Sequence, residues 1–232
     1  MATRAVFFDL GGTLLVMRRD RIFRRVVNEE GRDASVDAIH RAYMGLESWW
    51  LTTYAAAAMS PEETVEAYRH LDQMVFSSLF PEAGGEEALR VSRLVRKRWP
   101  ELEKSVPLEL YPDVEPTLAT LGRKGYTLGL ISNAPADTER VVKPLGLDRY
   151  MTTLVFSGAV GYTKPHPEIF RIAMKGASSR PEESVHVGDV YEADIVGARN
   201  AGMKGLLIDR LGVHSDLDCP KLASLDQIYG QL

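Results

Sequence analysis

Several features that define whole classes of protein are missing from this chain of 232 residues. It has a single cysteine, Cys219, so it cannot form an internal disulfide or a cysteine-based metal site. Its 28 basic residues are outnumbered by 32 acidic ones, which argues against binding nucleic acid or anionic membranes by bulk charge. No uncharged run approaches the roughly 18 residues of a membrane span. These absences predict a cytoplasmic protein with no nucleic-acid or membrane partner.

Short apolar runs bounded by glycine or polar residues are present at five places. They cover residues 5–9, 127–132, 153–157, 184–188 and 205–209. Runs of this length and composition are typical of buried parallel strands. Helical patterns separate the later runs, and we expect these helices at residues 112–124, after a cap at Asp137, from Pro167, from Tyr191 to Gly202, and at 222–229. The alternation predicts an α/β fold.

Residues 16–109 show only helical periodicity. Apolar stripes predict four helices, at about residues 22–31, 39–54, 60–75 and 86–98. The third opens with the capping box Ser60-Pro-Glu-Glu63, and the fourth is expected to end at Trp99-Pro100. The sequence therefore predicts an α/β core domain, residues 1–15 and 110–232, with a helical domain, residues 16–109, inserted after the first strand.

Polar side chains follow the predicted strands at the edge where an open parallel sheet binds its ligand. Asp9 ends the first strand, Ser132-Asn133 the second, and Asp189 the fourth, with Asp194 five residues on. Three carboxylates at one edge would repel unless a cation joined them, and Mg²⁺ prefers oxygen ligands. Ser132-Asn133 offer hydrogen-bond donors and Lys164 a positive charge, which suits a phosphoryl group beside the metal. An aspartate in such a place can also be a nucleophile.

Four segments resemble the motifs of the haloacid dehalogenase-like hydrolases. They are FFDLGGTL, LISN, GYTKPHPEIF and VHVGDVYEADIVGARNAGM, and the likeness covers about residues 4–15 and 110–210. The helical insert falls where the helical-cap subfamily carries its cap. Within that subfamily the chain resembles the branch with a cap Trp-Trp pair, here Trp49-Trp50, and a GD-x-Y-x-x-D fourth motif. The resemblance implies a Rossmann-like three-layer core with a parallel sheet and an inserted four-helix cap domain.

The same resemblance implies catalytic and phosphate-binding roles. Asp9 would be the nucleophile of a phosphatase that hydrolyses a small phosphorylated metabolite. Ser132 and Asn133 would hold the phosphoryl oxygens, and Lys164 would neutralise their charge. Thr13 would help set the geometry of the first loop.

The metal site implied by the resemblance takes Mg²⁺. Asp9 and Asp189 would be ligands, Asp194 would support the metal directly or through water, and the backbone carbonyl of Gly11 would complete the set. Most phosphatases of the family carry a second aspartate at the position of Gly11, which protonates the leaving group and then activates water. The sequence therefore predicts that metal binding survives while this general acid/base is missing.

The helical region offers few candidates for substrate contact. Arg18 follows the first loop closely, and Trp49 is a second candidate, although helical spacing favours Trp49 as core. His186, within a predicted buried strand, is expected to be a core histidine. The sequence leaves the choice of substrate open, and a monomer and a homodimer are both compatible with it.

Three alternatives to a phosphatase follow from Gly11. A haloacid dehalogenase also lacks the second aspartate, but it needs no metal and does not keep a Gly-Asp-x₄-Asp segment like residues 188–194. A phosphonatase-like enzyme requires a cap lysine, and residues 14–96 contain none. The last alternative is a phosphate- and metal-binding module that has lost useful turnover.

Overall fold

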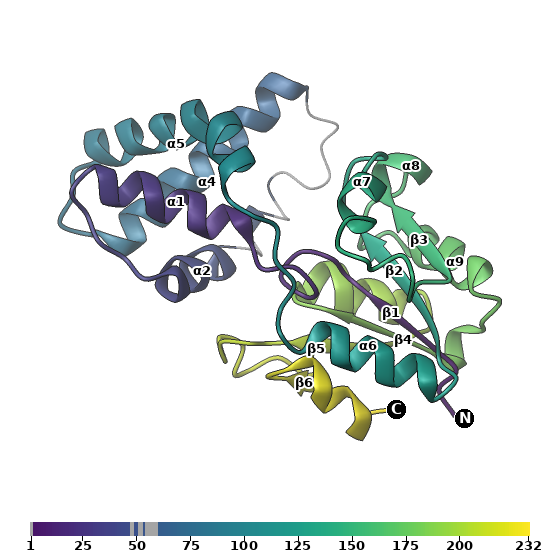
Figure 1. Ribbon diagram of the computed structural model, residues 1–232. Coiled ribbons are helices and arrows are strands. Elements are labelled where there is room, and N and C mark those ends of the chain that lie inside the picture. The colour runs from purple at the N-terminus through teal and green to yellow at the C-terminus, as the bar shows by residue number, and fades with distance from the viewer. Residues whose placement is uncertain (1, 47–48, 51–52, 54–59) are drawn as a thin grey trace. The chain divides into compact units, whose positions relative to one another are not determined.

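The computed structural model describes residues 2–46, 49–50, 53 and 60–232. The chain divides into two compact units (Figure 1). The core unit comprises Met1–Val16 and Glu109–Leu232, and the helical unit comprises Met17–Leu108. The core unit contains the sheet, and the described residues of the helical unit form helices and their connections.

The core unit is built on a sheet of parallel strands, which confirms the predicted α/β class. The strands are β1 (Ala5–Phe8), β2 (Thr127–Ser132), β3 (Thr153–Phe156), β4 (Ser184–Gly188), β5 (Lys204–Ile208) and β6 (Lys221–Leu222). Their spatial order is β3-β2-β1-β4-β5-β6. The five predicted strands are confirmed, and the two-residue strand β6 was not predicted.

The order of the strands creates a topological switch point between β1 and β4. From β1 the chain continues outward through β2 and β3, then returns to the other side of β1 and continues through β4, β5 and β6. Connections that diverge in this way leave a crevice at the carboxyl ends of the two strands. Phe8 pairs with Val187, so Asp9 follows β1 at the same level as Gly188 ends β4.

Helices cover both faces of the sheet (Figure 1). The helices described in the core unit are α6 (Val114–Arg123), α7 (Glu139–Val142), α8 (Ser157–Val160), α9 (Pro167–Gly176), η1 (Pro181–Glu183), η2 (Tyr191–Val196), α10 (Gly197–Asn200) and η3 (Leu225–Gly230). Alternate residues of a strand face opposite sides. Ala5 and Phe7 of β1 accordingly share a hydrophobic cluster with α9, whose Phe170 is fully buried.

Two helix starts in the core unit differ from those that the sequence predicts. Asp137 was predicted to cap a helix, and this is wrong: α7 begins at Glu139 with Thr138 at the N-cap. The Thr138 hydroxyl donates to the carbonyl of Pro135 at 2.6 Å, while Asp137 forms an exposed ion pair with Arg140. The helix predicted from Tyr191 is present, but its first turns are the π-helix η2, and α10 completes it.

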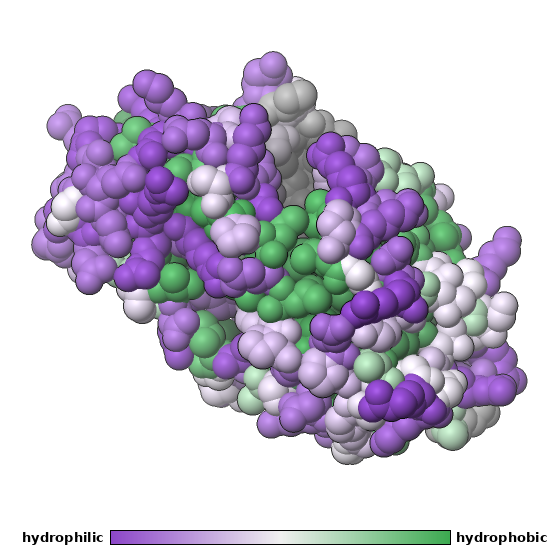
Figure 2. All heavy atoms as spheres, viewed as in Figure 1, coloured by the Kyte–Doolittle hydropathy of each residue, from purple (hydrophilic) through white to green (hydrophobic). Residues whose placement is uncertain are grey.

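The helical unit contains α1 (Arg18–Glu29), α2 (Val36–Gly45), α4 (Pro61–Leu79) and α5 (Gly85–Ser105). The capping box at the start of α4 is confirmed, because Ser60 Oγ accepts from the N–H of Glu63 and the Glu63 carboxylate accepts from the N–H of Ser60. Buried side chains from all four helices form one cluster. Figure 2 shows mostly hydrophilic side chains on the visible face of this unit. The second predicted helix was expected to reach Tyr54, which lies outside the described residues.

The prediction that Trp99-Pro100 ends the last helix is wrong. Helix α5 passes through Pro100 and ends at Ser105. Proline inside a helix costs about 3 kcal/mol, because it removes a hydrogen bond and crowds the preceding turn. Beyond the proline, Leu102 is fully buried and Val106 is 9% exposed, and both belong to the core cluster of the helical unit. Burying two such side chains contributes about 3–5 kcal/mol, which offsets the cost of the proline.

A charged group is buried in this unit. The Asp72 side chain is 1% exposed, and its Oδ1 accepts a hydrogen bond from the Tyr43 hydroxyl at 2.6 Å. Arg96 Nε lies 2.6 Å from Asp72 Oδ2, as an ion pair without hydrogen-bond alignment. The guanidinium of Arg19 lies 3.8 Å above the centre of the Tyr43 ring. The carboxylate is therefore held by Arg96 and Tyr43, and Arg19 packs against the Tyr43 ring.

The raised pKa of Asp72 predicts how the free energy of unfolding depends on pH. Burial is the main cause that raises its pKa to about 6, although Arg96 and Tyr43 act to lower it. The folded state then binds a proton that the unfolded state lacks, so the contribution of Asp72 to stability is complete below about pH 4 and is lost as the pH rises through about 6. On lowering the pH from about 7 to about 5, the free energy of unfolding should rise by about 1 kcal/mol more in the native chain than in Asp72→Asn. Urea denaturation measures this, and identical pH dependence in the two proteins would contradict it.

Candidate active site

Two glycines allow carboxylates to approach the backbone at the carboxyl ends of β1 and β4. Gly12 has φ +76°, and a Cβ on it would overlap the carboxylate of Asp189. A Cβ on Gly188 would overlap the carboxylate of Asp194. The GG turn and the GD step in the sequence therefore have a steric purpose. They leave room for acidic side chains between the two strand ends.

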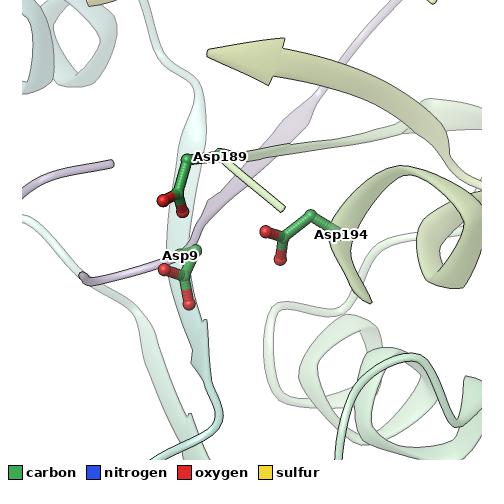
Figure 3. Close-up of side chains that lie close together, drawn as sticks. All are labelled: Asp9, Asp189 and Asp194. Carbon is green, nitrogen blue, oxygen red and sulfur yellow. The ribbon is translucent and has the colours of Figure 1, made fainter. Parts of the chain in front are cut away.

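Three carboxylates converge at this point. Asp9 comes from the end of β1, Asp189 follows β4, and Asp194 lies on η2 (Figure 3). One oxygen from each lies within 4.8 Å of the others. Asp9 and Asp189 are each 8% exposed, and Asp194 is fully buried. The residues predicted from two segments, one around Asp9 and one carrying Asp189 and Asp194, thus form one buried acidic cluster.

Lys164 joins two of these carboxylates. Its Nζ lies 2.6 Å from Asp9 Oδ1 and 2.5 Å from Asp194 Oδ1, and its side chain is 3% exposed. Burial acts to lower the pKa of Lys164, but the nearby carboxylates of Asp194 and Asp9 outweigh it and raise the pKa. The ammonium group therefore remains charged in the folded protein.

The carboxylate of Asp194 is engaged on both oxygens. Besides Lys164, Oδ1 accepts from His186 Nε2 at 2.9 Å, while Oδ2 accepts from the N–H of Val190 at 3.0 Å. Burial would raise the pKa of Asp194, but Lys164 and His186 outweigh it and lower the pKa. His186 is fully buried, which confirms its prediction as a core histidine, and burial lowers its pKa. The hydrogen bond from His186 to Asp194 was not predicted.

The charges suit a divalent cation. Burial, followed by the repulsion of Asp9 and Asp194, raises the pKa of Asp189 well above its usual value. Three carboxylates face one ammonium group, and Asp189 Oδ1 has a weak contact from the Thr13 hydroxyl at 3.4 Å. Oxygens bound to one Mg²⁺ lie about 2.1 Å from the metal and therefore up to about 4.2 Å apart, so small side-chain rotations would close the cluster around it. The donor set fits Mg²⁺.

Ser132 and Asn133 lie at the end of β2. Ser132 is 6% exposed. The side-chain amide of Asn133 is occupied: Nδ2 donates to the carbonyl of Lys164 at 3.0 Å, and Oδ1 accepts from its N–H at 2.8 Å. Asn133 therefore clamps the loop that carries Lys164. The sequence pattern did not predict this clamp.

A second clamp was missed at the sequence level. Arg210 donates to both oxygens of Asp113, at 2.7 and 3.1 Å, and to the carbonyl of Thr13 at 2.9 Å. The Thr13 side chain in turn contacts Asp189. The guanidinium therefore holds the loop after β1 from outside the acidic cluster. No local pattern marks a pair whose members lie 97 residues apart.

We expect Arg210→Lys to weaken this clamp, because an ammonium group cannot make the two-pronged contact with Asp113 and also reach Thr13. The free energy of unfolding should fall by about 1–3 kcal/mol, and hydrolysis should slow because the first loop loses its anchor. Arg149→Lys, at an exposed pair with Glu115, is the control and should change stability by less than about 1 kcal/mol. Urea denaturation and steady-state kinetics measure both effects, and equal behaviour of the two variants would refute the clamp.

The two predicted substrate contacts belong to the helical unit. Arg18 is the first residue of α1, and its Nη1 lies 3.8 Å from the Glu103 carboxylate. Trp49 packs against the hydrophobic cluster of that unit, edge-on to His70 at 5.2 Å. Among the described residues, no helix is both long enough and apolar enough to cross a bilayer.

Comparison with known proteins identifies the family. The family model of the haloacid dehalogenase-like hydrolases matches residues 3–202. The chain belongs to this family and is a hydrolase.

Two relatives illustrate the range of similarity. A glyceraldehyde 3-phosphate phosphatase from Methanothermobacter thermautotrophicus is 30% identical over 225 residues, which cover 96% of this chain and 93% of that protein. A phosphoserine phosphatase from Thermus thermophilus is 35% identical over 144 residues, 60% of this chain and 54% of that protein. The second match therefore spans only about half of the relative's length.

Solved structures agree on the fold. A magnesium-bound hydrolase from Bacillus subtilis, YfnB, superposes with a TM-score of 0.64 at 17% identity, covering 100% of this chain and 99% of that one. A HAD phosphatase from Thermococcus onnurineus gives 0.59 at 24% identity, with 99% and 97% covered. At these identities the likeness shows the fold alone.

Proposed function

We propose that this hydrolase is a Mg²⁺-dependent phosphatase that cleaves a small phosphate monoester through Asp9. The observation that carries the proposal is the buried cluster of three carboxylates and Lys164 at the carboxyl ends of β1 and β4. The similarity to glyceraldehyde 3-phosphate phosphatases, which extends over nearly the whole chain, supports the type of reaction.

The proposed reaction has two steps at Asp9. A carboxylate oxygen of Asp9 bonds to phosphorus while the bond from phosphorus to the alcohol oxygen breaks, and the alcohol leaves as an anion that takes its proton from solvent. Water then attacks phosphorus and gives its proton to solvent, the bond to Asp9 breaks, and inorganic phosphate is released. Lys164, the Ser132 hydroxyl and the Asn133 N–H hold the phosphoryl oxygens throughout.

Bound Mg²⁺ would neutralise charge between Asp9 and the phosphoryl oxygens. Asp9 and Asp189 would hold it together with the carbonyl of Gly11. Asp194, whose oxygens already accept from Lys164, His186 and Val190, would act mainly by fixing Lys164 and would support the metal through water. Thr13 would orient Asp189.

The helical unit is proposed as the cap of the helical-cap subfamily, in the branch with the Trp-Trp pair. A cap of this kind would exclude water from the site and select the substrate. Arg18 is the stronger of the two predicted contacts, because Trp49 already packs into the cluster of the helical unit.

The names of the relatives suggest the substrate class. Glyceraldehyde 3-phosphate and phosphoserine are both monoesters of three-carbon compounds. We place the substrate of this chain among small phosphorylated metabolites of that size. The free Cys219 is compatible with a reducing cytoplasm, and we place the enzyme there, as a monomer or a homodimer.

Phosphate release from para-nitrophenyl phosphate, measured with Mg²⁺ and with EDTA, tests the proposal. This leaving group departs unprotonated, so the assay does not depend on the acid missing at Gly11. Release that requires Mg²⁺ is the expected result. Chloride release from 2-chloropropionate without metal would instead identify a dehalogenase. Mg²⁺-dependent binding of inorganic phosphate with no turnover would identify the binding module that Gly11 also allows.

A further inference from the structure

The helical unit contains a cavity of about 490 Å³. It lies where the start of α1 meets α4 and α5, and Arg18, Arg19, Val65, Tyr68, Arg96 and Trp99 are among its lining residues. Sites for small organic ligands have volumes of about 300–1,000 Å³ and combine apolar walls with a few fixed polar groups. The cavity meets both conditions. All of its lining residues that the structure describes belong to the helical unit.

The polar part of the wall is cationic. Arg18 and Arg19 come from the first turn of α1 and Arg96 from α5. Within the described part of the chain, no carboxylate lines the cavity. The apolar part includes Val65, which is 54% exposed, and Tyr68, which is 37% exposed. A ligand with one anionic end and one apolar end would match this division.

Two of the guanidinium groups are held in place before any ligand arrives. Arg19 Nε lies 3.2 Å from Asp20 Oδ1, and its guanidinium stacks on Tyr43. Arg96 pairs with the buried carboxylate described above, and its guanidinium lies 4.3 Å above the Trp99 ring. Rigid donors lose little entropy when they bind a ligand, so this arrangement favours affinity.

Hydrogen-bond donors in the wall remain unused. Nε of Arg18 and Nη2 of Arg96 are both buried, and neither has an acceptor among the residues that the structure describes. A buried donor of a charged group without a partner is destabilising, and a bound oxyanion would supply the missing acceptor.

The charge balance selects the kind of anion. Arg19 and Arg96 each face an aspartate, whereas Arg18 has Glu103 at 3.8 Å, a side chain that is 52% exposed and therefore screened by water. About one positive charge is left for the ligand. A carboxylate carries one negative charge, and a phosphate monoester carries nearly two at neutral pH. The balance favours a carboxylate.

We propose that this cavity binds an organic carboxylate, with the carboxylate on Arg18 and Arg96 and the apolar part against Val65, Tyr68 and Trp99. The site shares Arg18 with the proposed substrate contacts, but none of its residues belongs to the Asp9 cluster, so carboxylate binding here goes beyond the phosphatase reaction and does not require hydrolysis at Asp9.

Calorimetric titration of the full chain with phenylacetate tests the proposal, with phenylacetamide as the neutral ligand of equal shape. We expect saturable binding of the acid and at least tenfold weaker binding of the amide. Arg18→Gln removes a donor, and Val65→Trp fills the cavity without changing charge; each should weaken binding of the acid at least tenfold. Arg90→Gln, an exposed arginine of the same unit outside the cavity, is the control and should bind as the native chain does.

Asp9→Asn separates this result from the proposed function, because it should bind phenylacetate unchanged even if the chain hydrolyses no phosphate ester. The proposal is overturned if acid and amide bind alike, if the acid does not saturate up to about 10 mM, or if both Arg18→Gln and Val65→Trp bind it as the native chain does. Circular dichroism of each variant confirms that it is folded.

Discussion

Asp9→Asn should lower the Mg²⁺-dependent hydrolysis of para-nitrophenyl phosphate by at least about 10³-fold, because the amide oxygen is a poor nucleophile and a poor metal ligand. The two side chains have nearly the same shape, so the fold should persist. Asp9 Oδ1 also contacts Lys164 Nζ at 2.6 Å, and the substitution removes the negative charge from that contact. Lys164 keeps its contact with Asp194 Oδ1 at 2.5 Å, so stability should be affected far less than catalysis.

The matched control for this variant is Asp137→Asn, the same chemical change at an exposed side chain outside the cluster. It should keep the native rate. Thermal unfolding of both variants separates loss of the nucleophile from loss of the fold. A rate within tenfold of native in a folded Asp9→Asn protein would remove Asp9 from the mechanism.

Leaving-group dependence should be steep in the native chain. Without an acid at Gly11, the alcohol oxygen departs unprotonated, so aryl phosphates should be cleaved much faster than alkyl phosphates. General acid catalysis is worth about 10²–10⁴-fold, and we expect a difference of this order beyond that shown by a relative with the second aspartate. The ratio kcat/KM is the quantity to compare across substituted phenyl phosphates and phosphoserine, because it includes the step in which the leaving group departs.

Gly11→Asp restores the carboxyl group and should raise kcat/KM for phosphoserine by about 10²-fold or more while changing that for para-nitrophenyl phosphate little. Gly11→Asn, of equal size but without an ionisable proton, is the control and should not show the gain. Equal kcat/KM for aryl and alkyl esters in the native chain would show that another group already supplies the proton. An equal gain in both variants would show that the gain does not come from proton transfer by the restored carboxyl group.

The sheet and its functional edge were predictable because their signals are local. Runs such as residues 127–132 are apolar, short and preceded by a glycine turn, which is typical of a buried parallel strand. The polar residue that follows each run then lies at the carboxyl edge by geometry alone. For this reason Asp9 and Asp189 could be assigned to one place from the strand pattern. Lys164 and Asp194 do not directly follow a strand, and the resemblance to the family supported their assignment. The structure brings all four together.

The helix through Pro100 was not predictable in the same way. From the local sequence, proline is expected to end a helix because it destabilises the helix interior. Here the burial of Leu102 and Val106 offsets that cost, and their burial depends on the other helices of the unit. The predicted start of α7 was wrong for a similar reason. The Thr138 hydroxyl donates to the preceding carbonyl of Pro135, and Asp137 forms an ion pair with Arg140 instead of capping the helix.

The supporting contacts of the site depend on pairs that are distant in sequence. Asn133 clamps the backbone of Lys164, 31 residues away, and Arg210 holds Thr13 from 197 residues away. The sequence shows an asparagine and an arginine at these positions but not what they face. Predicting the reacting groups was therefore easier than predicting the groups that position them.

The most direct test of the central claim is to trap the phosphoryl group on Asp9. With no carboxyl group at position 11 to activate water, hydrolysis of the aspartyl-phosphate should be slow, so the intermediate should accumulate after rapid mixing with para-nitrophenyl phosphate and Mg²⁺. Acid quenching and peptide mass spectrometry should place one phosphoryl group on Asp9, and none should be found with EDTA or in Asp9→Asn. Phosphate release without any labelled peptide, at a rate unchanged in Asp9→Asn, would contradict the account.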